Sequence, residues 1–552
     1  MDMADTNTLK IVFLPENSHV HVLPGTTVLE AAGRANIIIE TPCGGKGTCG
    51  QCRVIVRRNA PPPNKTERSR LSARELESGV RLACQALITE DMTIEVAASS
   101  RFVGQKILAH GLDTTCKLEP SVSLDPDDKA GLLYGAAFDV GTTTIVGALL
   151  DLAEGDQLAV SSRSNPQIPL GDDVIARIGH AGDGGLRGLQ RLVIDCVNEM
   201  IGEMCKAAGV GVESVYEVAF VGNTTMNHLL LGIDPTQLAH APYHAVLLES
   251  RCLAASKLGL RIRPTGRVYT MANIAGYVGG DTVGVILAAG MHEYDGVQLA
   301  LDVGTNGEIV LGGRRRLVTC STAAGPAFEG ARIKHVMRAA KGAIETVIID
   351  GDVQLNVIGA HKPRGLCGSG VIDAVAALLD AGMVESSGRM LPPDELPAAL
   401  PDKLRARVIE LDGQTAFVLV RAEESGRDGP VCLTQRDVRE VQLGKAAIYA
   451  GTMMILREYG ATVEGLDRIL LAGAFGNYVR ARSVIRIGLL PQVPESKVEF
   501  IGNAAGTGAR MVLAGRTCRE AAEAIAKKAE YVELAGRPDF QAEFADAMMF
   551  PE

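Results

Sequence analysis

The sequence predicts a multidomain α/β protein, and three features of the chain carry that prediction. A short phrase occurs twice, at residues 138–145 and 301–310, with an apolar run, an Asp, a Gly-Thr turn and a second apolar run. From about residue 132 onward, strand-like apolar runs alternate with helix-like segments. Near the N-terminus lies a cysteine-rich loop flanked by short strand-like runs. A length of 552 residues allows about three domains.

The repeated phrase is typical of two strands joined by a tight hairpin. Glycine allows such a turn to approach a ligand closely, Thr hydroxyls and turn amides can hold phosphate oxygens, and Asp can hold Mg²⁺ or its water. The residues concerned are Asp139, Gly141, Thr142, Thr143 and Thr144 in the first copy and Asp302, Gly304, Thr305 and Asn306 in the second. In a single ordinary hairpin the Asp only caps the turn. Two copies indicate two related half-domains that face each other across a cleft.

Composition and charge exclude several classes of protein. The net charge is −10, so the chain lacks the basic field that binding of nucleic acid requires. An apolar fraction of 47% supports a large core. We expect no signal peptide and no membrane span, because neither a basic start with an apolar stretch nor a run of about 18 apolar residues occurs. Irregularly spaced cysteines favour a reducing cytoplasm over a secreted disulfide framework.

Residues 1–98 form one predicted unit. Strands are expected at residues 10–14, 19–23, 53–56 and 93–96, and helices at residues 28–35 and near 72–78. Thr27 is in place to cap the first helix. Two strands, a helix and a returning strand predict a β-grasp-like sheet.

The cysteine-rich loop of this unit predicts an iron–sulfur cluster. Cys43, Cys49, Cys52 and Cys84 follow the spacing C-x5-C-x2-C-x31-C, and plant-type [2Fe–2S] ferredoxins use C-x4-C-x2-C…C. Glycines fill the loop, and only such a loop can wrap its backbone amides closely around a cluster. The alternatives are a structural zinc site or four unrelated core thiols. Zinc favours paired C-x2-C knuckles, and only Cys49 and Cys52 form one.

The connector at residues 99–131 contains glycine, proline and an acidic run, which suits a linker. Beyond it, a long amphipathic helix is expected at residues 186–208 and a buried strand at 215–221. Residues 391–429, rich in Pro and charge, are interpreted as peripheral. The other eight cysteines are interpreted as buried apolar side chains; they are Cys116, Cys196, Cys205, Cys252, Cys320, Cys367, Cys432 and Cys518.

Several glycine-rich turns follow predicted strands, where open α/β sheets bind ligands. Together with the two hairpins, the turn at residues 473–477 resembles the ASKHA superfamily of acetate and sugar kinases, Hsp70 and actin. The hairpins match its two phosphate motifs, and residues 473–477 match its adenosine motif. Residues 279–284 and 502–508 resemble its two connecting helices.

With the cysteine-rich loop added, nearly the whole chain resembles the reductive activators of corrinoid proteins. The phrases at residues 221–228 and 324–330 are also typical of that family. The resemblance implies an N-terminal [2Fe–2S] ferredoxin domain (1–98), a linker (99–131) and a two-lobed ASKHA-type ATPase domain (132–552).

The resemblance also implies an activity. ATP hydrolysis would drive one electron from the cluster to a corrinoid protein of a methyltransferase system, reducing inactive Co(II) to Co(I). Asp139 and Asp302 would hold Mg²⁺ and its water as catalytic residues. The implied nucleotide-binding residues are Gly141, Thr142, Thr143, Thr144, Gly304, Thr305, Asn306, Gly325, Glu329, Gly473, Ala474, Phe475, Gly476 and Asn477. An electron donor such as a ferredoxin or flavin reductase is implied, and the protein could form a homodimer.

Two other functions stay open at the level of sequence. One is an ATP-dependent activator of a different enzyme, such as a dehydratase. The activators of that kind bridge a [4Fe–4S] cluster across a dimer and lack a ferredoxin loop, so Cys43 to Cys84 argue against it. The other is an ATP-sensing ferredoxin module that does not hydrolyse ATP.

Overall fold

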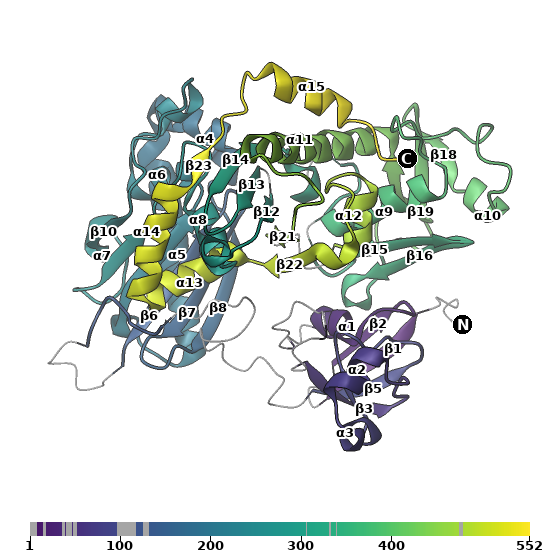
Figure 1. Cartoon of the computed structure of the whole chain (residues 1–552), viewed down its shortest axis with the longest axis horizontal. Helices are drawn as coiled ribbons and strands as arrows, with labels where there is room; N and C mark the ends of the chain where they lie inside the picture. The colour runs from purple at the N-terminus through teal and green to yellow at the C-terminus, as the bar shows by residue number, and fades with distance from the viewer. Residues whose placement is uncertain are drawn as a thin grey trace.

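The computed structural model of the chain shows a small N-terminal domain and two larger lobes (Figure 1). It describes residues 8–14, 18–35, 39, 47, 52–96, 117–124, 132–304, 306–329, 333–337, 339–473 and 479–552. Within these ranges no helix is both long and apolar enough to cross a bilayer. Most of the predicted linker lies outside the described residues. Its described part includes Glu119, which forms a parallel bridge with Gly515.

The N-terminal domain is a mixed five-stranded sheet in the order β2-β1-β5-β3-β4, with β1 and β5 parallel. Side chains of α1 pack on the same core as those of β1 and β5. The predicted β-grasp arrangement is confirmed. The elements are β1 (Leu9–Leu14), β2 (Ser18–Val22), α1 (Val28–Arg34), β3 (Arg53–Arg58), α2 (Lys65–Arg70), α3 (Ala73–Glu77), β4 (Val80–Leu82) and β5 (Met92–Glu95).

Two local features of this domain bear on the sequence prediction. Thr27 caps α1 as expected, since the Glu30 amide donates to Thr27 Oγ1 (3.2 Å) and the Thr27 amide donates to Glu30 Oε2 (2.9 Å). Helix α2 and strand β4 were not predicted. The sequence of α2 is entirely polar except for alkyl stems and therefore shows no apolar periodicity.

The first lobe contains a six-stranded sheet in the order β10-β11-β9-β6-β7-β8. Its long helix α5 covers one face, and the buried strand β9 runs directly into α6, both as predicted. The elements are β6 (Tyr134–Val140), β7 (Thr144–Asp151), β8 (Gln157–Ser164), α4 (Val174–His180), α5 (Leu186–Ala208), β9 (Val215–Gly222), α6 (Thr224–Leu231), β10 (Arg251–Ala254), α7 (Ala255–Leu258), β11 (Arg267–Thr270) and α8 (Gly280–Ala288).

The second lobe contains a six-stranded sheet in the order β22-β21-β12-β13-β14-β23, with additional small sheets at its outer side. The sheet strands are β12 (Gln298–Val303), β13 (Gly307–Gly312), β14 (Leu317–Thr322), β21 (Arg468–Ala472), β22 (Val498–Gly502) and β23 (Glu530–Tyr531). The remaining elements of this lobe are β15 (Ala343–Asp350), β16 (Asp352–Val357), η8 (Ile358–Ala360), β17 (Gly365–Leu366), α9 (Gly368–Asp380), α10 (Asp402–Arg405), β18 (Val408–Leu411), β19 (Gln414–Val420), β20 (Val431–Thr434), α11 (Gln435–Tyr459), α12 (Ala481–Arg486) and α15 (Pro538–Asp546). Two further helices, α13 (Ala504–Ala514) and α14 (Arg516–Lys528), return to pack on the first lobe.

The two large sheets share one strand arrangement. In each, an antiparallel three-stranded meander (β6-β7-β8 or β12-β13-β14) is extended by two strands parallel to its first strand (β9 and β11, or β21 and β22). The repeated phrase forms the first hairpin of each meander. The predicted pair of related half-domains is therefore confirmed by topology.

Helices α8 and α13 lie between the two sheets and share one apolar core with both. They touch at two glycines, because a Cβ atom on Gly508 would lie only 2.4 Å from the Cα of Gly284. No other residue type allows the two backbones to approach so closely. These helices are the two connecting helices that the sequence predicted, and the lobes meet along them.

Some expectations from the sequence were wrong. Residues 391–429 are not merely peripheral, since Val408 of β18 and Phe417 of β19 belong to the main core of the second lobe. Among the cysteines, Cys252 is exposed, and Cys518 is buried but disulfide-bonded. Five others are buried thiols as expected, namely Cys196, Cys205, Cys320, Cys367 and Cys432, while Cys116 lies outside the described residues.

Candidate functional site

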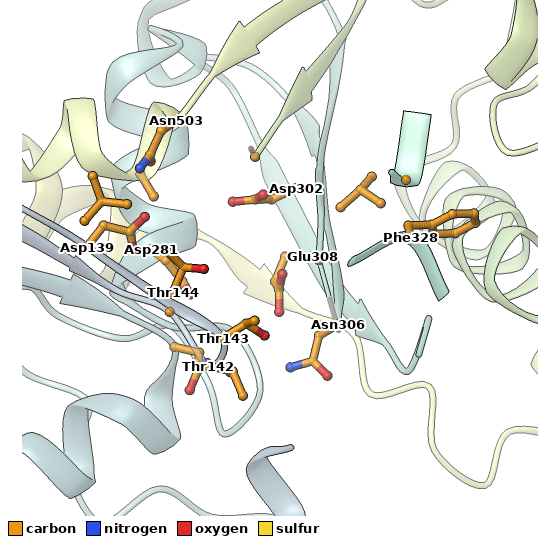
Figure 2. A pocket seen from close by; sticks show the side chains of 18 of the residues that line it. Asp139, Thr142, Thr143, Thr144, Asp281, Asp302, Asn306, Glu308, Phe328 and Asn503 are labelled. Carbon is orange, nitrogen blue, oxygen red and sulfur yellow. The ribbon is translucent and has the colours of Figure 1, made fainter. Parts of the chain in front are cut away.

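A cavity of about 420 Å³ opens between the two lobes and is lined by both repeated hairpins (Figure 2). Nine residues predicted to bind the nucleotide or its metal ion line it. They are Asp139, Gly141, Thr142, Thr143, Thr144, Asp302, Gly304, Asn306 and Gly473. The fold thus brings together residues that are far apart along the chain.

Both hairpin turns are held tightly by their own backbones. The Gly141 amide donates to the Thr144 carbonyl (3.0 Å), and the Gly304 amide donates to the Asn306 carbonyl (3.0 Å). A Cβ atom on Gly141 would lie 2.8 Å from the Thr144 carbonyl oxygen, so glycine is required there. Thr305 lies outside the described residues.

Four carboxylates line the cavity, two on each side. Figure 2 shows Asp139 and Asp281 near each other, with Asp302 and Glu308 on the other wall. Glu308 stands directly opposite Asp302 in the pairing of β12 and β13. Like charges placed directly opposite destabilise an antiparallel pair. The pair brings two carboxylates together on this wall, which suits a ligand that arrives with a cation.

Asp139 and Asp281 are strongly perturbed acids. Burial raises the pKa of Asp139 to about 7, the negative charge of Asp281 adds to the rise, and a hydrogen bond with Asn503 opposes it. Burial likewise raises the pKa of Asp281 to about 6, opposed by hydrogen bonds with Thr282. Both keep some surface toward the cavity, so they are desolvated by the surrounding protein yet reachable by a ligand. Paired perturbed acids in a cleft are typical of functional sites.

The carboxylates do not form a complete metal site by themselves. Within the described residues, no group of three or more His, Cys, Asp or Glu side chains is arranged to hold a metal ion. Mg²⁺ usually binds through one or two carboxylates, water and substrate phosphates. The cavity therefore fits a magnesium ion that arrives with a nucleotide.

The second wall of the cavity combines a glycine turn with a helix start. Gly473, at φ +93°, follows β21, and a Cβ atom there would lie 2.8 Å from Asp302 Oδ1. Gly368 and Ser369, at the N-terminus of α9, also line the cavity. Exposed backbone amides at a helix start favour negative charge. The turn and the helix start therefore shape this wall for an anionic ligand.

Some predicted nucleotide residues are placed differently or not described. Gly325 does not line the cavity, although Phe328 in the following turn does. The backbone of Glu329 belongs to that turn. Ala474, Phe475, Gly476 and Asn477 lie outside the described residues.

Sequence reasoning missed several residues that line the cavity: Asn223, Asp281, Glu308, Ser369 and Asn503. Asp281 and Asn503 stand at the starts of the two connecting helices, so a signal existed in the two glycine-rich phrases that contain them. Glu308 could have been found by writing out the strand pairing of the second hairpin outward from its turn, which places Glu308 opposite Asp302.

The first hairpin is also fixed from behind by a buried cation. Arg177, on α4, is fully buried, and its guanidinium donates to the carbonyls of Thr142 (2.6 Å) and Gly171 (2.8 Å) and to Gln167 Oε1 (3.0 Å). Burial lowers its pKa to about 10, so it stays charged at neutral pH. In the described part of the chain no carboxylate forms an ion pair with it. Asn165 supports the same turn by donating to the Gly141 carbonyl (2.9 Å).

Replacing Arg177 is expected to weaken ATP binding more than adenosine binding. An Arg177→Met variant leaves the Thr142 carbonyl without its donor and removes a positive charge behind the phosphate turn. A loss of about 1–3 kcal/mol corresponds to roughly 5- to 150-fold in affinity for ATP. Isothermal titration calorimetry with ATP and with adenosine measures the difference, and Arg177→Lys should fall between. Equal losses for both ligands would show that the variant only disrupts the lobe.

The two perturbed acids predict a pH dependence of stability in the absence of metal and nucleotide. Their raised pKa values mean that the folded protein favours the protonated forms. This stabilisation is complete below the ordinary carboxyl value of about 4 and is lost as the pH rises through about 6 and about 7. We therefore expect the Tm with EDTA to fall between pH 5 and pH 8, and the fall to be smaller in Asp139→Asn. An identical slope in that variant would contradict the assignment.

The cluster region is described in part. Cys52 and Cys84 are both buried, and their Sγ atoms lie 3.3 Å apart. At a metal–sulfur distance of about 2.3 Å, two thiolates this close can bind one metal ion. Gln85 Nε2 lies 3.7 Å from Cys84 Sγ, as a donor to a cluster ligand would. These residues fit an iron–sulfur cluster, while Cys43 and Cys49 lie outside the described residues.

The fold and the site define an ASKHA-type nucleotide-binding protein with a ferredoxin domain. Comparison with protein families supports each part. A family described as the 2Fe-2S iron–sulfur cluster binding domain matches residues 12–89, the RACo middle region matches residues 134–294, and the C-terminal ASKHA domain of RACo matches residues 296–552. The N-terminal domain is thus a [2Fe–2S] ferredoxin domain.

Two relatives and one solved structure identify the family to which the whole chain is similar. The corrinoid activation enzyme RamQ of Eubacterium limosum is 32% identical, across 98% of this chain and 99% of its own. The [Co(II) methylated amine-specific corrinoid protein] reductase of Methanosarcina barkeri is 25% identical across 72% of this chain and 73% of its own. The solved structure of a reductive activator for corrinoid,iron–sulfur protein aligns with a TM-score of 0.72 at 32% identity, covering 99% of this chain and 98% of that one. The chain belongs to the family of reductive activators of corrinoid proteins.

Proposed function

We propose that the protein uses ATP to reduce the cobalt of a partner corrinoid protein from Co(II) to Co(I), one electron at a time. The observation that carries the proposal is the union, in one chain, of a [2Fe–2S] ferredoxin domain and an interlobe cavity lined by two phosphate-type hairpins. The full-length similarity to RamQ supports it. The partner is a corrinoid protein of a methyltransferase system.

ATP is needed because the electron transfer is uphill. Plant-type [2Fe–2S] clusters have potentials near −400 mV, and Co(I) is the stronger reductant. Each 100 mV of difference costs about 2.3 kcal/mol per electron. A nucleotide can supply that energy only by binding one conformation better than another. Closure of the two lobes around ATP is such a change.

The residues divide into two groups by role. In the cavity, Asp139 and Asp302 orient Mg²⁺ and its water, and Asp281 and Glu308 complete the acidic walls. The hairpin residues Thr142, Thr143, Thr144, Thr305 and Asn306 contact the phosphates, with Gly141 and Gly304 in the turns. The turn of Gly473 to Asn477 meets the nucleoside, and the turn that follows Gly325 and contains Glu329 borders the cavity through Phe328. In the ferredoxin domain, Cys43, Cys49, Cys52 and Cys84 hold the cluster, which supplies one-electron chemistry.

The rest of the proposal concerns the electron donor, the oligomeric state and the cellular location. An electron donor, such as a ferredoxin or a flavin reductase, refills the cluster after each transfer. A homodimer and a cytoplasmic location complete the proposal. Neither nucleic acid nor a membrane is a partner. The net charge of −10 supports the exclusion of nucleic acid.

The acidic cavity favours hydrolysis over simple ATP sensing. Four carboxylates around a phosphate site would repel ATP without a metal ion, so they suit a magnesium-dependent reaction. The ferredoxin domain separates the chain from dehydratase activators that lack one.

The test is a reduction assay with purified Co(II) corrinoid protein, monitored by absorbance as Co(I) forms. We expect Co(I) with ATP and Mg²⁺, and little with ADP or a non-hydrolysable ATP analogue. ATP hydrolysis should rise when the corrinoid protein is added. Reduction at the same rate and extent without ATP would overturn the proposal.

A further inference from the structure

Helix α2 of the ferredoxin domain presents an exposed basic face. Lys65, Arg68 and Arg70 are all exposed on this six-residue helix, with the lobes in place. The chain as a whole carries a net charge of −10, so a cluster of three cations on one helix stands out from its surroundings. We call the solvent-exposed surface that Lys65, Arg68 and Arg70 form around this helix the α2 basic face. Figure 1 shows α2 within the small domain, apart from the two lobes.

The only carboxylate of α2 does not neutralise this face, because it points inward. Glu67 is 1% exposed. One of its oxygens accepts from the Asn64 amide (2.9 Å) and the other from the Leu82 amide (3.0 Å). Its charge is therefore used to cap the helix and join it to β4. What remains at the surface of α2 is cationic.

Two neighbouring arginines, by contrast, are paired with carboxylates. Arg53 pairs with Glu75 (3.4 Å), and Arg57 pairs with Glu95 (2.6 Å). Within the described residues, no ion pair joins any member of the α2 basic face to a carboxylate. The face therefore keeps its positive field toward solvent.

Helix α2 and its N-cap residue contact the cluster region through Thr66 and Asn64, beside the α2 basic face. Thr66 Cγ2 would be 2.7 Å from a Cβ atom on Gly47, which stands between two of the cluster cysteines in sequence. Asn64 Nδ2 donates to the Gln85 carbonyl (3.3 Å), and Gln85 Nε2 is 3.7 Å from Cys84 Sγ. A protein that docks on α2 is therefore only one layer of residues from a cluster ligand. Close approach of this kind is what electron transfer between proteins requires.

We infer that the α2 basic face is the docking site of an electron-carrier protein with an acidic surface, which delivers the electron to the [2Fe–2S] cluster. In the transfer, the carrier is oxidised by one electron and the cluster is reduced by one, with no bond or proton exchanged. Complementary charge raises the rate of such encounters by about 10- to 1,000-fold at low salt. The inference rests on the proposed function, because it names the class of donor for that same cluster.

A different edge of the domain meets the ATPase lobes. Strand β2 contacts η8 (Ile358–Ala360) of the second lobe. The donor can therefore dock while the ferredoxin domain rests on the lobes. The corrinoid protein, whose reduction depends on ATP, is expected to engage the lobes instead. The experiment separates these two partners.

The test compares charge reversal on α2 with the same change elsewhere. The test variant is Lys65→Glu, Arg68→Glu and Arg70→Glu in the full-length holoprotein. The probe is a purified acidic ferredoxin with two [4Fe–4S] clusters. We expect its binding, measured by calorimetry at low ionic strength, to weaken at least about tenfold. Stopped-flow reduction of the [2Fe–2S] cluster by the reduced probe should slow by a similar factor and lose its salt dependence.

The matched control is Arg187→Glu, Arg191→Glu and Lys206→Glu, three exposed residues of α5 in the first lobe. It changes the net charge by the same amount. Binding and reduction should stay within about twofold of the parent protein in this control. Equal losses in both variants would overturn the inference, because net charge alone would then explain them.

Three further measurements complete the test. A carbodiimide cross-link of the probe to the parent protein should map to Lys65 by mass spectrometry, and cross-links that avoid α2 would overturn the inference. Reduced methyl viologen, a small cation, should reduce the cluster of the α2 variant at no less than the parent rate, which shows that the domain is intact. A pre-reduced α2 variant should transfer its electron to the corrinoid protein at the parent rate. Loss of that step with normal probe binding would assign the face to the corrinoid protein and overturn the inference.

The binding, cluster-reduction and cross-linking outcomes can be read whether or not the proposed function holds. Probe binding and cluster reduction need neither ATP nor a corrinoid protein. If the donor inference fails, ATP-dependent reduction of Co(II) with a chemical reductant still tests the function.

Discussion

An Asp302→Asn variant is expected to lose about 100-fold or more of its ATP hydrolysis while keeping the visible spectrum of its cluster. Asp302 ends β12 at the interlobe cavity and faces Glu308 across the hairpin. Asparagine preserves the shape but removes the negative charge that we propose orients Mg²⁺ and its water. The cluster stays intact because its cysteines belong to a separate domain. Steady-state ATPase rates and absorbance spectra measure the two effects.

Asp402→Asn is the control for this prediction. Asp402 is exposed on α10 of the same lobe and far in sequence from both hairpins. The substitution should leave hydrolysis unchanged. If Asp302→Asn hydrolyses ATP within about threefold of the parent rate, the phosphate assignment of the second hairpin is wrong.

The second large effect concerns the cluster. Cys84→Ala should abolish the [2Fe–2S] signal and all electron transfer to the corrinoid protein, while ATP binding stays unchanged. Cys84 is buried 3.3 Å from Cys52, so removing its thiolate leaves the metal ion that the two would share one ligand short. Iron analysis should fall from about two irons per chain to near none. Electron paramagnetic resonance of the reduced protein and calorimetry with ATP complete the measurement.

Cys205→Ala serves as the matched control, because Cys205 is a buried thiol of the first lobe whose pKa burial raises to about 11. Its protonated thiol is not a metal ligand, and its loss should leave the iron content at the parent value. A parent protein that contains zinc and no iron would contradict the cluster assignment for all four cysteines.

Patterns within short stretches of sequence were sufficient to predict most of the helices and strands. The helix at residues 186–208 matched α5 because its apolar stripe is long and its end is marked by Gly209 in the left-handed region. By contrast, α2 has no apolar periodicity from which a helix could be predicted, because its buried side chain is that of Glu67. Residues 391–429 were misjudged because the short hairpin of β18 and β19 is hidden among prolines and charges.

Only the parts of the candidate site that consist of consecutive residues were predicted from the sequence. The two hairpins carry their phosphate pattern in consecutive residues, so their role was visible. Asp281 and Asn503 enter the cavity at the starts of α8 and α13, far along the chain from Asp139, so the three side chains meet only in the folded structure. Arg177 was hidden for the same reason, because the turn that it supports lies in a different part of the chain.

The contact between Gly284 and Gly508 has a thermodynamic consequence. Two helices that touch backbone to backbone carry no interlocking side chains at that point, so we expect them to rotate past each other with little elastic resistance. A stiff joint would consume part of the free energy of nucleotide binding as deformation. A compliant joint leaves that free energy for the difference between the open and closed states. We therefore expect the share of ATP-binding free energy that is available for reducing cobalt to depend on the two glycines, Gly284 and Gly508, at this helix contact.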